Sequence, residues 1–141
     1  MTSTTTQRTH TRRQLRQDRG ETSIQMAIVF PFVIAATLLV VQVSLWYFAR
    51  EAALTAAREG AGTGRTYRST PADGAARARS VLDRTAGDLL QDASVSTTGS
   101  TAQRVRVQVR GTALSVLPGV PGLRITQSAS GPTERWTTPG G

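Results

Sequence analysis

The residues of this sequence that could perform acid–base or nucleophilic chemistry are few and scattered. There is one histidine, His10, and the chain contains neither cysteine nor lysine. The nine acidic residues are spread along the chain, and none is paired at a spacing that points to a shared catalytic site. No cluster of His, Cys and Asp has the spacing of metal ligands. We therefore expect no enzyme activity, no catalytic residue, no cofactor and no metal site.

A different kind of site is indicated where an arginine-rich start meets a long apolar run. The junction reads "GETSIQMAIVFP", residues 20–31. Gly20 and Glu21 stand at the border, Gln25 lies just inside the run, and Pro31 falls in its first third. A proline near the start of a helix costs little, so Pro31 is compatible with a helix that it kinks or leaves straight.

The apolar run itself predicts a membrane-spanning helix. From Ile24 to Ala49 the chain has 26 residues without Asp, Glu, Lys or Arg. As a helix this segment would extend roughly 39 Å, enough to cross a hydrocarbon layer of about 30 Å with some tilt. Trp46 and Tyr47 lie near its end, where amphipathic aromatic side chains favour the lipid headgroups. The roughly 90 residues that follow are too few to surround such a helix in a soluble domain, so we expect lipid as its partner.

The charge distribution bears on orientation and on partners. The net charge of +8 is carried by arginine alone. Residues 8–23 hold five Arg and two acids (+3), whereas residues 50–65 hold three Arg and two acids (+1). The positive-inside bias therefore predicts a cytoplasmic N-terminus and an extracytoplasmic body in a single-pass cell-membrane protein. Arginine is spread rather than massed, so we expect no nucleic-acid partner.

Composition and turn residues divide the chain into four parts. Residues 1–20 are polar and basic and are expected to form a disordered leader. Residues 21–62 are expected to form the transmembrane helix with an extracytoplasmic extension, a single helix from about Ile24 to Glu59 that stops at Gly60 and Gly62. Residues 63–136 should form a small head and residues 137–141 a tail.

The head is predicted to start with a second, amphipathic helix. Thr70 as N-cap, Pro71 at the first helical position and Asp73 form a capping-box pattern, which opens a helix from Pro71 to about Leu90. Its apolar side chains recur every three or four residues, which predicts one buried face: Ala75, Ala78, Val81, Leu82, Ala86 and Leu89.

Beyond Asp92 the apolar period changes to two, which predicts about three antiparallel strands and hence an α+β fold. "ASVST" and "RVRVQV" flank a glycine-containing turn, and "LRITQSAS" supplies the third strand, with a loose tail from Gly131. Val105, Val107 and Val109 should face the second helix. Arg104, Arg106 and Arg110 should face away, either as the solvated side of a one-sided sheet or as a surface for acidic polymers.

These elements together resemble the TadE-like proteins, pilin-related components of tight-adherence (Flp) pilus systems. That family has basic residues, then Gly, a Glu at the fifth position after it, an apolar run and Pro. Gly20 and Pro31 match, and Gln25 occupies the position where the family usually has Glu. "AAREGAGTGR", residues 56–65, and "SASGPTERW", residues 128–136, are similar to later stretches of the family.

The resemblance implies a role as a minor pilin or assembly component of a pilus or secretion machine, with the subunits of that machine as partners. It also implies processing by an inner-membrane prepilin peptidase between Gly20 and Glu21. Two other interpretations stay open: an exported protein whose first 50 residues are a signal, and an envelope protein that binds acidic polymers through its Arg-rich strand.

Overall fold

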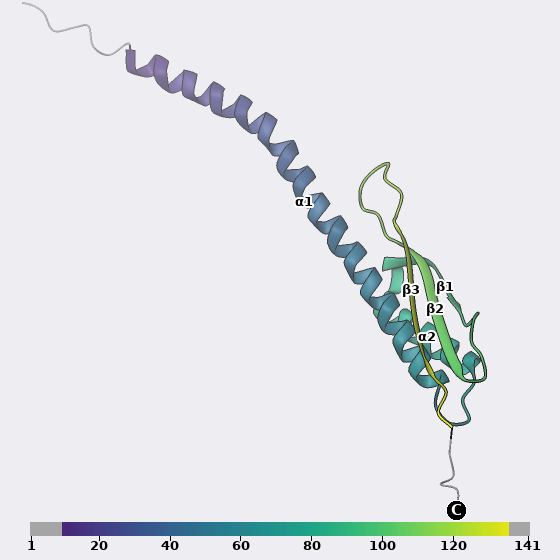
Figure 1. Cartoon of the computed structure of the whole chain (residues 1–141). Coiled ribbons are helices and arrows are strands. Elements are labelled where there is room, and N and C mark those ends of the chain that lie inside the picture. The colour runs from purple at the N-terminus through teal and green to yellow at the C-terminus, as the bar shows by residue number, and fades with distance from the viewer. Residues whose placement is uncertain (1–9, 136–141) are drawn as a thin grey trace, which may run out of the picture. The chain divides into compact units, whose positions relative to one another are not determined.

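The computed structural model describes the backbone of residues 10–135 and the side chains from Thr22 onward. The chain divides into two compact units, Met1–Leu39 and Val40–Gly141. Within residues 10–135, two α-helices and three strands follow each other in an α+β arrangement, which confirms the predicted fold class (Figure 1). The elements are α1 (His10–Gly64), α2 (Pro71–Thr85), the short 3-10 helix η1 (Gly87–Leu89), β1 (Leu90–Ser96), β2 (Arg104–Ala113) and β3 (Arg124–Pro132).

Helix α1 is longer than expected at both ends. It begins at His10, so the backbone of residues 10–20 is helical, and the prediction of disorder is wrong for that part of the leader. The reason lies in composition, since Arg, Gln and Leu are good helix formers and no Gly or Pro precedes Gly20. The helix ends at Gly64, and Pro31 lies inside it. Residues 1–9 and the tail 137–141, with Trp136, lie outside the described residues.

Helix α2 begins as the capping-box pattern predicts. The Asp73 backbone N–H donates to the Thr70 hydroxyl (3.2 Å), and the Thr70 backbone N–H donates to the Asp73 carboxylate (2.7 Å). The predicted end near Leu90 is wrong, since the helix stops at Thr85. Gly87 follows with φ +47°, a left-handed conformation that glycine adopts readily and that ends the helical path.

The three strands form an antiparallel sheet in the order β1-β2-β3. In the central pairing Val105 lies opposite Gly131, Val107 opposite Ala129 and Val109 opposite Gln127. The three valines are 0–2% exposed and the arginines between them are exposed, as the period of two predicts. The loose tail expected from Gly131 is wrong, because β3 reaches Pro132 and the Glu134 N–H donates to the Arg65 carbonyl (2.9 Å).

The core of the head is built from three sources: α2, the sheet and the part of α1 from residue 40 onward. In Figure 1 this part of α1 and α2 run along the same face of the sheet. The contribution of α1 consists mainly of alanines that are 0–5% exposed: Ala49, Ala53, Ala56, Ala57 and Ala61. The head therefore includes a stretch of helix that the sequence assigned to an extension outside it.

Close approach of α1 and α2 explains Gly60, which does not stop the helix as predicted. A Cβ at Gly60 would lie 2.6 Å from the Gly74 carbonyl oxygen and 3.2 Å from a Val107 methyl group. A Cβ at Gly74 would lie 2.6 Å from the Gly60 carbonyl oxygen. The two helices thus cross backbone to backbone, which is possible only where neither carries a side chain. Gly62, two residues on, has nothing within 4 Å of such a Cβ.

Candidate membrane segment and processing site

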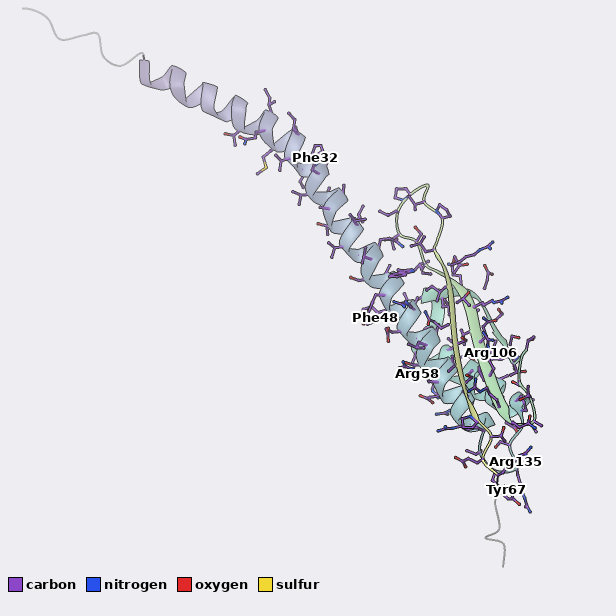
Figure 2. The ribbon with its side chains drawn as sticks, in the orientation of Figure 1. Phe32, Phe48, Arg58, Tyr67, Arg106 and Arg135 are labelled. Carbon is purple, nitrogen blue, oxygen red and sulfur yellow. The ribbon has the colours of Figure 1, made fainter. Side chains whose placement is uncertain are left out.

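The apolar part of α1 has the properties of a membrane-spanning helix by length and composition. The segment Thr22–Gly64 contains an 18-residue window of mean hydropathy 2.5, none of which is buried within the described residues. Large apolar side chains stand exposed along it: Ile24, Met26, Ile28, Phe30, Phe32, Val33, Leu39 and Val40. Phe32, 72% exposed, projects from the helix in Figure 2. Such a surface is costly in water and suits lipid.

The hydroxyl groups in this apolar run are hydrogen-bonded within the helix. Thr37 Oγ1 donates to the Val33 carbonyl and Ser44 Oγ to the Val40 carbonyl, each at 2.8 Å. Because hydrocarbon offers no partner to a polar group, an internal bond of this kind removes the cost of placing a hydroxyl there.

The predicted processing residues lie in the N-terminal part of α1. The backbone of Gly20 and Glu21 is helical, and their side chains lie outside the described residues. Gln25 is exposed, and Pro31 follows six residues later inside the same helix. The bond between Gly20 and Glu21 is thus part of a continuous helix, with Gln25 a little more than one turn further on.

The aromatic residues at the end of the run face different surroundings. Trp46 is partly buried and packs against the core of the head, and the Arg50 guanidinium carbon lies 5.8 Å from the centre of its ring. Tyr47 and Phe48 are 54% and 64% exposed. Figure 2 shows Phe48 on the side of α1 away from the sheet. Tyr47 and Phe48 are therefore available to contact lipid headgroups, whereas Trp46 packs α1 against the rest of the head.

Gln42 is a site residue that the sequence analysis missed. It is 8% exposed, and its amide holds the loop between β2 and β3. Gln42 Nε2 donates to the Leu114 carbonyl (3.2 Å), and Gln42 Oε1 accepts from the Val116 N–H (2.8 Å). The sequence feature that could have indicated Gln42 is an uncharged amide side chain inside the apolar run, since polar side chains in membrane segments turn toward protein partners.

The outer face of the sheet is basic, as the alternation predicts. Arg104, Arg106 and Arg110 on β2 are exposed, and Arg124 on β3 pairs with Thr112 in the register that puts it on the same face. In the part of the chain that the structure describes, none of these four guanidinium groups has an acidic partner. The face thus carries uncompensated positive charge.

Groups able to do other chemistry are sparse in the described residues. No cluster of three or more His, Cys, Asp or Glu there could hold a metal ion. Hydrogen bonds from the Thr70 backbone N–H and hydroxyl lower the pKa of the exposed Asp73 carboxyl below 3.8. Those hydrogen bonds cap α2, so the lowered pKa of Asp73 is a consequence of helix capping.

Comparison with protein families gives one match. The family model of the TadE-like protein matches residues 20–62, which begin at the predicted processing glycine and run through the apolar segment to the alanine-rich packing surface of α1. The resemblance predicted from the sequence is confirmed over these residues. Comparisons with curated proteins and with solved structures give no match.

Proposed function

We propose that this protein is a non-catalytic, single-pass membrane protein that acts as a minor pilin or assembly component of a tight-adherence (Flp) pilus or a related secretion machine. The observation that supports this proposal is that the family match and the exposed apolar helix fall in the same segment. The residues that match the TadE-like family model, 20–62, contain the apolar helix whose large side chains have no cover within the described chain.

The protein acts by binding rather than by catalysis. The exposed apolar part of α1 anchors the chain and packs laterally against helices of partner subunits. Ala35 and Ala36 are exposed on this part, and small residues allow close approach of helices in lipid. The head, held on the other half of α1, contacts further subunits outside the membrane.

The orientation follows from the arginine distribution. Five arginines precede the apolar segment within residues 8–23, against three in residues 50–65. The N-terminus is therefore cytoplasmic and the head extracytoplasmic.

Processing by a prepilin-type peptidase would remove residues 1–20 and leave Glu21 as the new N-terminus. The amide of Gln25 could then hydrogen-bond the terminal amine of a neighbouring subunit but could not neutralise its charge. Mass spectrometry of the mature protein tests the step: a mass reduced by residues 1–20, and retained in full when Gly20 is replaced by Leu, supports it. An intact N-terminus in both forms would contradict it and would leave an uncleaved assembly factor.

A deletion strain tests the pilus role. Loss of surface pili in the deletion, restored by the wild-type gene and not by a Phe32→Asp, Ile28→Asp double variant, is the expected result, because two charges on the lipid-facing surface of the span cost several kcal/mol. An Arg106→Ser gene serves as the matched control and should restore piliation. Unchanged piliation in the deletion strain would contradict the proposal.

A second candidate function is the binding of acidic envelope polymers, which the four unpaired arginines of the sheet face support. Binding through this face should weaken steeply with salt and should fall when Arg104 and Arg110 are both replaced by Ser. The third interpretation, a signal removed over the first 50 residues, has less support, because Gln42, Trp46 and Ala49 would be lost from the head with it.

A further inference from the structure

The loop between β2 and β3, residues 114–123, differs from the other connections of the head in being almost wholly apolar. Its sequence is LSVLPGVPGL, without a charged residue. Val116, Val120 and Leu123 are 39%, 48% and 56% exposed. A group of exposed apolar side chains in one loop indicates a surface that is covered by a binding partner or by lipid.

The loop is ordered by its own sequence. The Val120 N–H donates to the Leu117 carbonyl (3.2 Å) around Pro118 and Gly119, and Gly119 has φ +75°. Pro at the second position and a left-handed Gly at the third define a type II turn. At the base of the loop the Ala113 N–H donates to the Leu123 carbonyl (2.8 Å). The apolar side chains are thus presented on a fixed backbone.

Gln42 fixes the level of this loop along α1. Its amide bonds both Leu114 and Val116, so these residues lie at the height of position 42 on the helix. Gln42 lies 18 residues after Ile24, about 27 Å along the helix axis. From the Cα atom of Ile24 to that of Ala49 the apolar run extends about 38 Å, and a hydrocarbon layer of about 30 Å fitted within it always includes position 42, between about 3 and 11 Å from the boundary on the side of the head.

We propose that the loop of residues 114–123 inserts into the lipid leaflet on the side of the head, with Val116 and Val120 on the acyl-chain side of the boundary with the headgroups. This inference rests on the proposed membrane span of α1. Gln42 is the positioning residue, because its amide holds the loop backbone at that depth. The head is then held to the membrane at two points, α1 and the loop, which fixes its tilt for contact with partner subunits.

The chemistry of the loop and its rim fits a lipid surface. Pro118 and Pro121 remove two backbone donors from the loop, and the N–H groups of Leu114, Val116 and Val120 are already bonded. Fewer free polar groups lower the cost of leaving water. Arg124 follows the loop directly, and Arg50 lies about 12 Å beyond Gln42 along α1, so positive charge stands at the level of lipid phosphates.

Because the chain has no cysteine, single-cysteine variants of the full-length protein test this directly. Val120→Cys reports the loop and Thr98→Cys reports the exposed β1–β2 turn at the opposite end of the sheet. Each variant is labelled with the environment-sensitive dye NBD and reconstituted in vesicles of phosphatidylcholine and phosphatidylglycerol. Circular dichroism confirms that both are folded. The dye at position 120 should lose emission to nitroxide-bearing lipids and resist aqueous iodide, and the dye at position 98 should do the reverse.

Iodide quenching at position 120 equal to that at position 98 would overturn the proposal. A third variant, Phe32→Cys, separates this outcome from failure of the span itself. Lipid quenching at position 32 but not at 120 leaves the membrane anchor standing and removes the loop insertion. Absence of lipid quenching at position 32 overturns both.

The role of Gln42 has its own test. Gln42→Leu, combined with the labelled Val120→Cys, keeps a side chain of similar size but removes both hydrogen bonds to the loop. Lipid quenching at position 120 should decrease while that at position 32 is retained. Quenching at position 120 that is unchanged by Gln42→Leu would overturn its role as the positioning residue.

Discussion

The two halves of α1 use apolar residues in opposite ways. In residues 22–39 the side chains are large and exposed, with Ile28 at 59% and Phe32 at 72%. In residues 40–64 the apolar positions that matter are alanines, and Ala53 and Ala57 are 0% exposed. One continuous helix therefore changes from a surface suited to lipid to a surface suited to a protein core.

The difference follows from what each environment requires. Lipid chains have no fixed shape and adapt to the surface of a helix. Bulky apolar side chains therefore make transfer from water to lipid more favourable and meet no steric limit. A small head must bring helix and sheet close together to bury enough area, and small residues permit that approach. Gly60 against Gly74 is a close approach of this kind between α1 and α2, where an added Cβ at Gly60 would lie 2.6 Å from the Gly74 carbonyl oxygen.

The largest loss of stability in the head is expected from a charge placed in its core. Val107→Asp should abolish cooperative unfolding of the head, because an unpaired buried carboxylate costs about 3 kcal/mol or more. Arg106→Ser, on the exposed face of the same strand, should change stability by less than about 0.5 kcal/mol. Circular dichroism of the full chain in detergent during thermal unfolding measures both. Equal stability of the two variants would show that the assigned faces of β2 are wrong.

Replacing an alanine by leucine in each part of α1 tests the difference between the two parts directly. Ala57→Leu should destabilise the head by about 2–3 kcal/mol, because the buried position has no room for three further carbon atoms. Ala36→Leu, on the exposed half of the same helix, should stay within about 0.5 kcal/mol of wild type. Chemical unfolding in detergent reports the difference, and a similar response at both positions would remove the distinction between the halves.

A single methyl group tests the helix crossing. Gly60→Ala should cost about 1–2 kcal/mol, since its Cβ would lie 2.6 Å from the Gly74 carbonyl oxygen. Gly62→Ala is the matched control in the same helix, and with open space at its Cβ it should gain about 0.5–1 kcal/mol of helix stability. A stabilising Gly60→Ala in thermal unfolding would contradict the close crossing.

The smallest effect is expected at the α2 cap. Thr70→Ala should cost about 1 kcal/mol. Because hydrogen bonds from Thr70 lower the pKa of Asp73 in the folded state, its contribution is present above the ordinary value of 3.8 and is lost as the pH falls through the lower folded pKa. Acid titration of stability should therefore be flatter below pH 3.8 in Asp73→Asn than in wild type. Identical acid curves would contradict a capping role for this carboxylate.

Local patterns in the sequence predicted most of the head. The capping box at Thr70, the alternation of Val105 to Val109 and the three antiparallel strands all depend on neighbouring residues, and all are confirmed. The end of α2 was misplaced because the residues around Gly87 continue the apolar spacing, whereas its left-handed backbone stops the helix.

The long-range features could not be predicted in the same way. Alanine is both the best helix former and a good packing residue, so the alanines of α1 gave no sign that one face is buried. Gly60 was interpreted as a helix end, because a glycine that ends a helix and one that admits a second helix look alike in sequence. The bond between Gln42 and a loop more than 70 residues away depends on the tertiary fold alone.

The central claim is that the N-terminal half of α1 lies in the membrane and that the head lies outside. Labelling of single-cysteine variants in intact cells with a membrane-impermeant maleimide tests it most directly. The account predicts that Thr98→Cys is labelled in intact cells, whereas Phe32→Cys is labelled only after the membrane is dissolved and the protein denatured. Labelling of Phe32→Cys in intact cells, or of Thr98→Cys only after lysis, would contradict the account.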